Sequence, residues 1–417
     1  MSIIGYGKPE GNLNPSEIEA IIASGLEKLP LDDKRVLVII PDHTRTIPLP
    51  VFFRLLTRHL SGRVHALDFL VALGTHPPMN DQEILQLVGI TPQEKNTVFQ
   101  HIRLFNHSWQ DRSALTTLGT ISANELAEIS GGLLAIDVPI RLNRLVLDYD
   151  HLLVCGPVFP HEVVGFSGGN KYFFPGIAGA EIINFTHWLG ALITSYRLIG
   201  MQDTPVRQVI DRAASFIPIP RHALCSVVTE EGINGLFIGM PEDAYAAAAA
   251  LSAQVHIRWV DKPFHKVLSV LPEMYDEIWV GAKGMYKMEP VIADGGEVII
   301  YAPHIRRFSA AHGKVIREIG YHVRDYFTKQ WERFKDYPWG VLAHSTHLRG
   351  IGEYEDGVEK PRIQVTLATA IPESECLAVN LGYREPDSID LQAWSDREAE
   401  GILMVPRAGE DLYRLKS

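Results

Sequence analysis

Cysteine is rare in this sequence. It occurs three times in 417 residues, at Cys155, Cys225 and Cys376, and no two of these positions form a C-x-x-C pair. This spacing excludes a disulfide framework and argues against a zinc site built on thiolates. Isolated cysteines are typical of a reducing compartment, so we expect a cytoplasmic protein.

Excess positive charge and long hydrophobic runs are also missing. The net charge is −11 at pH 7, which argues against nucleic-acid or anionic-membrane partners because both select basic surfaces. No apolar run reaches the ~18–20 residues of a membrane span, and the chain does not start with a basic stretch followed by an apolar core. We therefore expect neither a membrane anchor nor a signal peptide, although a few local arginines and lysines would suffice for a small anionic substrate.

Short apolar runs alternate with helix-like stretches in the first half of the chain. Strands are predicted within 35–45, 64–76 and 147–161, and helices over 48–60 and 122–132. Strands that alternate with helices indicate an α/β fold with a mainly parallel sheet. Because 417 residues exceed one ordinary core, we expect two such domains.

A second series of elements follows an alanine-rich helix at 242–254. The predicted elements are strands at 275–284, 296–304, 339–347 and 375–383, and a helix at 324–334. We place the N-terminal domain at residues 1–260 and the C-terminal domain at 261–394. The segment 401–409 could return to the first sheet, which would add residues 395–417 to the first domain.

Polar side chains with catalytic potential fall where the predicted strands end. They are Asp42, Arg45, His76, His161 and Lys283. In open α/β sheets the ligand crevice lies at the carboxyl ends of strands, so these residues are predicted to converge on one cleft between the domains. Arg45 could hold a carboxylate, and His76 could titrate near neutral pH. The alternatives are a surface turn stapled by Asp42 and Arg45, and a loop histidine bonded to a carbonyl.

A glycine-rich loop carries one lysine, Lys171. Gly165, Gly168 and Gly169 permit positive φ or close approach of a ligand. Tyr172 follows the lysine where a P-loop requires Ser or Thr, so this is not a P-loop, and the loop contains no G-x-G-x-x-G. A lysine among apolar neighbours could act as a nucleophile. Alternatively, it could pair with Glu162 or Glu181.

Two histidines flank this loop. His161 precedes Lys171 by ten residues and could be a general base, or a buried structural histidine. His187 follows by sixteen residues in a helix-like stretch and could bind a metal, although a lone helical histidine is more often core or cap.

Several motifs occur together and in a fixed order. They are D-H-T-R (42–45), A-L-G-T-H (72–76), the run from His161 to Gly179 containing G-F-S-G-G-N-K and P-G-I-A-G, N-F-T-H (184–187), and K-G-M (283–285) followed by Gly295 and Gly296. In this combination the sequence resembles the nickel-dependent lactate racemase family over most of its length. The resemblance implies a cofactor, a nickel-pincer nucleotide (pyridinium-3,5-bisthiocarboxylic acid mononucleotide), and enzymes that mature it.

The resemblance also implies roles for individual residues. It implies cofactor attachment at Lys171, nickel ligation by His187, and acid/base catalysis by His76 and His161. The further residues it implies are Asp42, Thr44, Ser167, Gly168, Gly169 and Trp279 around the cofactor, and Arg45, Lys283 and Trp339 around the substrate.

The reaction that the resemblance implies is inversion of C2 of a 2-hydroxy acid. One histidine would remove the hydroxyl proton while hydride passes from C2 to the cofactor ring. Hydride would then return to the other face of the planar keto acid, and the opposite histidine would supply the proton.

The sequence departs from the family pattern near the substrate. Val280 stands where the family commonly has glutamine, and the loops at 302–313 and 343–347 differ. The additional polar side chains are His304, Arg306, Arg307, His312, His344 and His347. They suggest a substrate larger or more polar than lactate, such as a sugar acid or a malate-like acid, unless they face solvent. An independent metal site at His344 and His347 is disfavoured, because side chains three apart on a strand diverge.

Two other interpretations stay open. The chain could be a 2-hydroxyacid dehydrogenase or lyase that uses a free nicotinamide cofactor, although the missing G-x-G-x-x-G counts against it. It could also be a non-catalytic protein that binds nickel or an anion. In each case the expected partner is a small molecule, and a homo-oligomer is compatible with the sequence.

Overall fold

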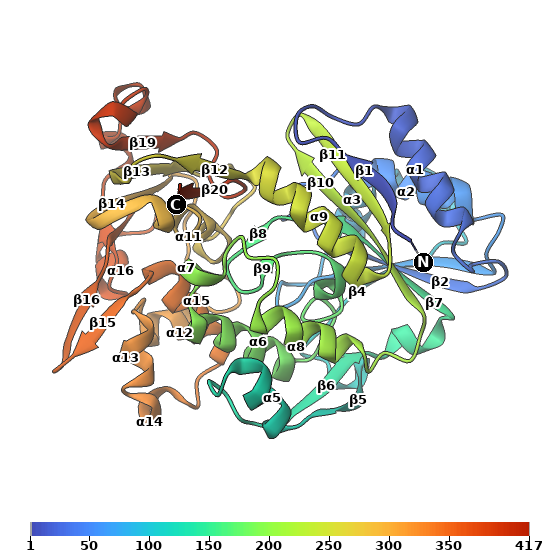
Figure 1. Cartoon of the computed structure of the whole chain (residues 1–417), viewed down its shortest axis with the longest axis horizontal. Helices are drawn as coiled ribbons and strands as arrows, with labels where there is room; N and C mark the ends of the chain where they lie inside the picture. The colour runs from blue at the N-terminus through green and yellow to red at the C-terminus, as the bar shows by residue number, and fades with distance from the viewer. Residues whose placement is uncertain (1, 417) are drawn as a thin grey trace. The chain divides into compact units, whose positions relative to one another are not determined.

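The structure, a computed structural model, describes residues 2–416 (Figure 1). The chain divides into two compact units, each built from three segments. Unit 1 comprises the segment ending at Phe159 together with Phe166–Ile183 and Arg207–Val255. Unit 2 comprises Pro160–Gly165, Asn184–Val206 and the segment from His256 onward. Each unit contains its own mainly parallel sheet, which confirms the predicted α/β class.

Seven strands form the sheet of unit 1, in the spatial order β1-β11-β10-β7-β2-β3-β4. Neighbours from β10 to β4 run parallel, whereas β11 is antiparallel to both β10 and β1. The bounds are β1 Ile4–Gly7, β2 Arg35–Pro41, β3 Ala66–Ala72, β4 Leu104–Asn106, β7 His151–Pro157, β10 Arg221–Thr229 and β11 Gly232–Gly239. Because β2 lies between β7 and β3, the carboxyl ends of these three strands share one edge of the sheet.

Alternating side chains of β2 fix the helices on one face of this sheet. Val36, Val38 and Ile40 belong to one hydrophobic core cluster with residues of α1 (Pro15–Glu27) and α2 (Leu49–Leu60). Successive side chains on a strand point to opposite faces, so this face alone carries the α1 and α2 contacts. Burial of such apolar side chains is the main stabilising contribution to the sheet's position.

Capping residues set the ends of several helices in unit 1. The predicted helix at 122–132 is α5 (Ala123–Ser130): Ser122 caps it at one end and Gly131 ends it in the left-handed conformation. The other elements are α3 Asp81–Val88, α4 Pro92–Asn96, η1 Arg112–Ala114, β5 Leu115–Ile121, β6 Val138–Asn143, η2 Arg144–Asp148, η3 Gly169–Tyr172, α8 Pro205–Ala214 and α9 Pro241–His256. Short strands β8 (Pro160–His161) and β9 (Gly165–Phe166) and helix α6 (Ala180–Ile193) occupy the stretch that contains the glycine-rich loop.

The sheet of unit 2 has five parallel strands, in the order β18-β17-β14-β13-β19. The strands of unit 2 are β12 Ile257–Val260, β13 Phe264–Val270, β14 Ile292–Ala302, β15 Gly352–Glu355, β16 Val358–Pro361, β17 Gln364–Thr369, β18 Gly382–Tyr383, β19 Ile402–Val405 and β20 Leu412–Leu415. Strands β12 and β20 pair separately, and β15 and β16 form the orange hairpin of Figure 1. Strand β19 pairs with β13, so the prediction that 401–409 returns to the first sheet is wrong.

Helices of unit 2 replace three predicted strands. The helices are α7 Ser195–Leu198, α10 Ile278–Gly281, α11 Lys283–Tyr286, η4 Glu289–Val291, α12 Gly313–Ile319, α13 Arg324–Thr328, α14 Trp331–Phe334, α15 Trp339–Arg349, α16 Glu373–Ala378, η5 Pro386–Ser388, η6 Leu391–Trp394 and η7 Glu398–Glu400. The strands predicted at 275–284, 339–347 and, for most of its length, 375–383 are therefore wrong. Residues 341–349 are buried all round the helix, which removes the 3.6-residue periodicity that identifies a surface helix.

The helices within residues 2–416 are each too short or too polar to span a bilayer.

Candidate functional site

Adjacent strand ends in unit 1 place Asp42 beside His76. Asp42 follows β2 directly and His76 lies four residues beyond the end of β3, and the two strands are parallel neighbours. Nδ1 of His76 lies 2.5 Å from Oδ2 of Asp42. The sequence predicted both residues at one sheet edge, but it did not predict that they bond to each other.

The Asp42 carboxylate is buried and fully engaged. Its other oxygen, Oδ1, accepts hydrogen bonds from the backbone N–H and the hydroxyl of Thr44, at 3.0 and 2.6 Å. Burial alone would raise the pKa of Asp42, but the charge and hydrogen bond of His76, with help from Arg45 and Thr44, hold that pKa well below its usual value. Asp42 is therefore ionised throughout the physiological pH range.

An ionised Asp42 fixes the tautomer of His76. A carboxylate only accepts hydrogen bonds, so Nδ1 of the ring must donate and carry the proton. In the neutral ring, Nε2 is then the nitrogen with the available lone pair. This is the orientation in which a buried aspartate prepares a histidine to act as a base.

Arg45 completes a polar group on this edge. Its Nη1 donates to the hydroxyl of Thr44 at 3.0 Å, so Thr44 links the arginine to the Asp42 carboxylate. The side chain of His76 is 23% exposed and Arg45 is half-buried, so both are accessible to a small ligand. The predicted alternative, a turn stapled by Asp42 and Arg45, is incomplete, because the carboxylate also bonds His76 and Thr44 while the charge of Arg45 helps to lower its pKa.

Arg207 of α8 hydrogen-bonds the backbone of the glycine-rich loop. The buried guanidinium donates to the carbonyl oxygens of Phe166 at 2.6 Å and Gly168 at 3.2 Å. Asn170, also buried, donates to the carboxylates of Asp211 and Glu242. These contacts fix the backbone on both sides of the loop, so the position of Lys171 is set by the fold.

The glycines of the loop are required by its own packing. Gly168 and Gly169 have φ values of 93° and 57°, which strongly favour glycine. A Cβ on Gly168 would come within 2.5 Å of Val158, and one on Gly169 within 2.8 Å of Tyr245. Ser167 is also structural, because its hydroxyl accepts the backbone N–H of Phe159. The predicted roles of these three residues toward a cofactor stay predictions.

Lys171 lies in η3, the short 3₁₀ turn that follows these glycines, and is half-buried. The next residue, Tyr172, feels the charges of Arg45 and Asp42, which places the lysine turn near the strand-end residues of the same unit. Burial raises the pKa of Tyr172 well above its ordinary value, so its hydroxyl stays protonated.

Glycine at position 156 makes room for Tyr172. Gly156 lies within the buried strand β7, and a Cβ there would come within 2.0 Å of the Tyr172 hydroxyl oxygen. The hydroxyl end of the tyrosine ring can therefore approach the strand this closely only because residue 156 has no side chain.

The carboxylates suggested as partners of Lys171 have other contacts. Glu181 pairs with Arg141, and Glu162 lies beside His161 in unit 2, with Oε2 at 3.1 Å from Nδ1. The same Nδ1 lies 3.1 Å from the backbone N–H of Val163. A neutral His161 ring can accept the N–H of Val163, whereas a protonated ring can donate to Glu162. The sequence suggested Glu162 as a partner of Lys171 and did not predict its contact with His161.

His187 is half-buried on α6, as the helix-like pattern predicted. In unit 2 the amide oxygen of Asn184, on the same helix, accepts the backbone N–H of Gly340 at the start of α15. His347, farther along α15, is buried and feels the charge of His187. Burial is the larger cause and lowers the pKa of His347 to about 3. His347 is therefore neutral at physiological pH.

Trp279 packs against two histidines of unit 2, stacked on His344 and tilted by 37° to His312. Its ring centroid lies 4.1 Å from that of His344 and 4.4 Å from that of His312. Nε2 of His344 donates to the carbonyl oxygen of Trp279, at 3.1 Å, which leaves Nδ1 as the acceptor. Burial lowers the pKa of His344 to about 3. Its Nδ1 is buried and has no hydrogen-bond partner among residues 2–416.

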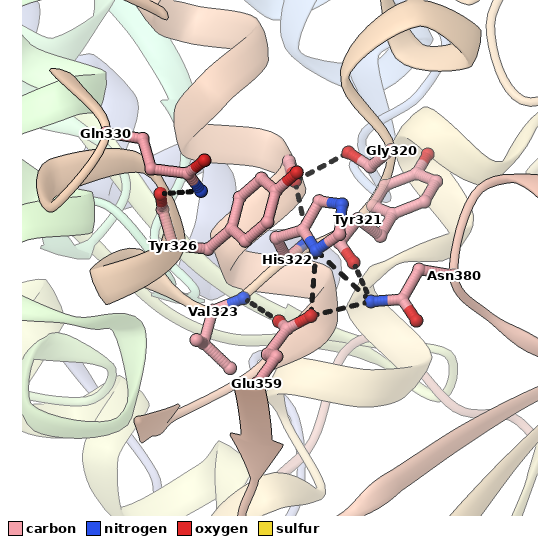
Figure 2. A network of polar contacts seen from close by, with 9 residues as sticks. Gly320, Tyr321, His322, Val323, Tyr326, Gln330, Glu359 and Asn380 are labelled. Atoms are coloured by element: carbon pink, nitrogen blue, oxygen red, sulfur yellow. Dashed lines mark hydrogen bonds and ion pairs between the residues drawn. The ribbon is translucent and has the colours of Figure 1, made fainter. Parts of the chain in front are cut away.

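Helix α15 is fixed by Ser345, which lies between the two histidines. The Ser345 hydroxyl donates to the carbonyl of Gly320 and accepts the backbone N–H of His322. Figure 2 shows the adjoining network, in which the Glu359 carboxylate accepts from Val323 and His322 and from the amide of Asn380. His344 and His347 were expected to diverge on a strand. They lie on a helix instead, where residues three apart occupy neighbouring positions of one face, so that expectation is wrong.

The two residues of unit 2 that were predicted to bind the substrate, Lys283 and Trp339, each begin a helix and contact other residues of the protein. Lys283 begins α11 rather than ending a strand, and its ammonium lies 4.4 Å from the centroid of the Tyr275 ring. Trp339 begins α15, and its indole N–H donates to the carbonyl of Lys335. The indole donor therefore already has a partner within the protein.

Apart from His312, which packs against Trp279, the additional polar side chains divide into two groups. Arg307 pairs with Asp276, His304 bonds the carbonyl of Tyr275, and Arg306 is exposed. These three are therefore engaged elsewhere or face solvent, as the alternative predicted. His344 and His347 are buried, and each has one ring nitrogen with no partner in the described chain.

The donor set suits the implied cofactor in its chemistry. Lys171 offers an amine for covalent attachment and His187 a single imidazole nitrogen for nickel, which favours mixed nitrogen and sulfur ligands. Residues 2–416 hold no group of three or more His, Cys, Asp or Glu side chains arranged to bind a metal.

Comparison with known proteins gives a consistent result. A family model described as the lactate racemase N-terminal domain matches residues 16–197. The lactate racemase of Thermoanaerobacterium thermosaccharolyticum is 24% identical over 66% of this chain, and that of Lactiplantibacillus plantarum is 27% identical over 66%. Each alignment spans 62% of the relative's own length.

Two solved structures share the fold. A structural-genomics protein from Thermotoga maritima superimposes with a TM-score of 0.90 and 36% identity, covering 98% of this chain and 100% of that one. The lactate racemase apoprotein of T. thermosaccharolyticum superimposes with a TM-score of 0.71 and 20% identity, covering 99% and 94%, and supports the fold alone.

Proposed function

We propose that the chain is a racemase or epimerase that inverts C2 of a 2-hydroxy acid with a nickel-pincer nucleotide bound at Lys171, because residues 16–197 match the lactate racemase N-terminal domain and two similar proteins are lactate racemases. The relatives named as lactate racemases are only 24–27% identical to this chain. They support the reaction class and do not define the substrate.

One observation carries the proposal: the contact of Asp42 with His76 beside Arg45. A binding protein has no use for a histidine whose Nδ1 proton is held by a buried carboxylate. That arrangement prepares Nε2 to exchange a proton with a ligand. Arg45 is linked to the same carboxylate through Thr44 and provides the cation that a 2-hydroxy acid requires.

The proposal assigns a role to each of the chain's own groups. Arg45 and Lys283 bind the carboxylate of the substrate. Nε2 of His76 accepts the C2 hydroxyl proton from one enantiomer and returns it when the reaction runs in reverse. His161 does the same for the other enantiomer, and Glu162 accepts a hydrogen bond from its ring when the ring is protonated. Two bases are needed because the proton leaves from opposite sides of the two enantiomers.

The cofactor would be held by two residues. Lys171 provides the amine for covalent attachment, and His187 provides the imidazole ligand to nickel. When bound, the nickel-pincer nucleotide supplies the site that accepts and returns hydride. The chain's contribution is to hold the loop rigid, through Arg207 and Asn170, so that the attached group has a fixed position.

The substrate is proposed to be more polar than lactate. His344 presents a buried Nδ1 that can accept one hydrogen bond, and a methyl group cannot donate one. A hydroxyl of a sugar acid can. A malate-like dicarboxylate is the second candidate, but a neutral acceptor nitrogen would repel its second carboxylate, so the polyhydroxylated acid is favoured.

A single experiment tests the reaction class. The chain is produced together with the enzymes that mature the cofactor, and the intact protein is analysed by mass spectrometry and for nickel content. A covalent adduct on Lys171, stoichiometric nickel and conversion of one enantiomer of a 2-hydroxy acid into the other would support the proposal. An unmodified Lys171 with NAD-dependent oxidation would support a dehydrogenase instead, and nickel without turnover would support a binding protein.

The substrate is tested on the same preparation. Initial rates are compared for D- and L-lactate, D- and L-malate and a set of aldonates. We expect kcat/KM to be highest for an aldonate, and the variant His344→Phe to lose at least tenfold on that acid while its lactate rate changes little. Lactate as the best substrate would contradict the proposed substrate but leave the reaction class standing.

A further inference from the structure

A cavity in unit 2 is lined by none of the residues assigned to the reaction. Its volume is about 220 Å³, and residues of α6, α7, α13 and α15 line it. The lining contains two arginines, Arg197 and Arg324, and no carboxylate. It is therefore large enough for more than a single water molecule and carries positive charge.

Two of the lining residues carry buried polar atoms that have no hydrogen-bond partner within residues 2–416. His347 is 3% exposed, and its Nε2 has no hydrogen-bond partner within residues 2–416. The hydroxyl of Thr194 is likewise buried without a partner in the described chain. Leaving such groups unpaired destabilises a fold, so a ligand that bonds both would be strongly favoured.

Thr194 is also held in an unfavourable backbone conformation. Its φ and ψ angles are 87° and 140°, a region that a β-branched residue rarely occupies. The backbone is held there by its own hydrogen bonds, from Thr194 N–H to the carbonyl of Gly190 and from Arg197 and Leu198 to the carbonyl of Thr194. Strain of this kind, at a residue lining a cavity, is often found where a ligand is bound.

Arg324 is fixed in place before any ligand binds. Its Nη1 donates to the carbonyl of Leu192, and its Nε and Nη2 donate to Asp325. A guanidinium has five N–H donors, so three are used and two remain for a ligand. Asp325 offsets part of the charge of Arg324; it also pairs with Lys329, which in turn pairs with Glu355. The carbonyl groups at the carboxyl end of α6 carry partial negative charge, which disfavours a nearby anion. The hydrogen bond from Arg324 to the carbonyl of Leu192 offsets part of that charge.

We propose that this cavity is a second ligand site, which binds a small molecule bearing a carboxylate or phosphate group. Arg324 binds the anionic oxygens, Arg197 adds charge at the exposed side, and Thr194 and His347 bond the ligand from the buried side. The two arginines without a lining carboxylate favour an anion over a cation or an apolar molecule. The small volume excludes a nucleotide or a peptide.

The binding test uses the purified apoprotein, so its outcome does not depend on the proposed reaction. Inorganic phosphate and acetate are titrated separately by calorimetry, to distinguish the two anion classes. We expect saturable 1:1 binding of at least one of them. We also expect at least tenfold weaker binding to Arg324→Gln and to Thr194→Val, which keeps the shape of the side chain and removes only the hydroxyl.

Two matched variants control the test. Arg333→Gln removes an exposed arginine from neighbouring α14, and Arg45→Gln removes the arginine assigned to the substrate. Both should bind within twofold of the unchanged protein. Loss of binding in Arg45→Gln, full affinity in Thr194→Val, or no saturable binding at millimolar anion would each overturn the proposal. Circular dichroism of each variant excludes unfolding as the cause.

Discussion

At the scale of single residues, the contact between Asp42 and His76 determines which ring nitrogen exchanges protons. The carboxylate can only accept a hydrogen bond, so it selects the tautomer protonated on Nδ1. Thr44 holds the second carboxylate oxygen, which prevents Asp42 from rotating away. The chemical state of His76 therefore depends on a residue that need not contact the substrate.

Replacing Asp42 with asparagine should reduce kcat strongly. The amide N–H of the new side chain would donate to Nδ1 of His76 and select the opposite tautomer, with Nε2 protonated. By analogy with other aspartate–histidine pairs, we expect kcat to fall by about 10²–10⁴-fold with a smaller change in KM. Chiral chromatography of the product measures the rate. Cofactor content of the variant is the control, and a decrease of less than threefold at full cofactor content would contradict the role.

Substitutions at Lys171 and His187 should separate attachment from metal binding. Lys171→Arg keeps the charge but cannot form the covalent bond, so the intact mass should show no adduct. His187→Ala should keep the adduct and lose nickel on dialysis against a chelator, whereas the unchanged protein should retain it. Mass spectrometry and metal analysis measure the two effects. Retention of nickel by His187→Ala would show that another group is the ligand.

Strand-end residues were predictable from the sequence, but their partners were not. The apolar runs ending before Asp42 and His76 are strands, as predicted, and parallel neighbours bring their ends together. Direct bonding of the two side chains depends on loop geometry after each strand. The pairing of Glu162 with His161 had one sequence signal, adjacency, which by itself does not distinguish this contact from one with Lys171.

At the scale of elements, α15 organises unit 2. It carries His344 against Trp279 and His347 in the lining of the cavity that contains Arg197 and Arg324, and Ser345 between them bonds the chain at Gly320 and His322. The sequence prediction failed for this helix for a physical reason. A helix buried all round has no polar face, so its short apolar run cannot be distinguished from a buried strand.

Removing the Ser345 hydroxyl should destabilise unit 2. Ser345→Ala leaves the buried carbonyl of Gly320 and the N–H of His322 without this partner, at a cost of about 1–3 kcal/mol in the free energy of unfolding. Urea unfolding measures the change. Ser388→Ala is the matched control, because its exposed hydroxyl bonds only within a turn and should cost less than about 0.5 kcal/mol. Equal effects of the two substitutions would contradict the assignment.

At the scale of the whole molecule, a buried acid makes stability depend on pH. Glu289 is fully buried, and burial raises its pKa from the ordinary 4.5 to about 7, although it accepts the backbone N–H of Ile351 and feels the charge of Arg362. Between these pH values the unfolded chain has released a proton that the folded chain keeps. The free energy of unfolding should therefore fall as pH rises from about 4.5 to about 7, by about 3 kcal/mol in total.

Glu289→Gln should remove this dependence. The amide is neutral at every pH and its oxygen can still accept the N–H of Ile351. At pH 8 the variant should be more stable than the unchanged protein, and near pH 4.5 the two should be similar. Denaturant unfolding at several pH values measures the difference. Glu318→Gln, at an exposed position, is the control. It should change the free energy of unfolding by the same small amount at every pH. A stability difference between Glu289→Gln and the unchanged protein that is the same at every pH would contradict the raised pKa of Glu289.

The absent side chain at position 156 has a consequence for engineering. Tyr172 lies against β7 only because nothing projects from Gly156, and Lys171 is the residue before that ring. Adding a single methyl group there would push the phenol outward and tilt the adjacent amine, so a change inside a strand would misalign the residue proposed to anchor the cofactor. Designers who wish to admit bulkier acids should reshape the surroundings of Trp279 and leave this glycine as it is.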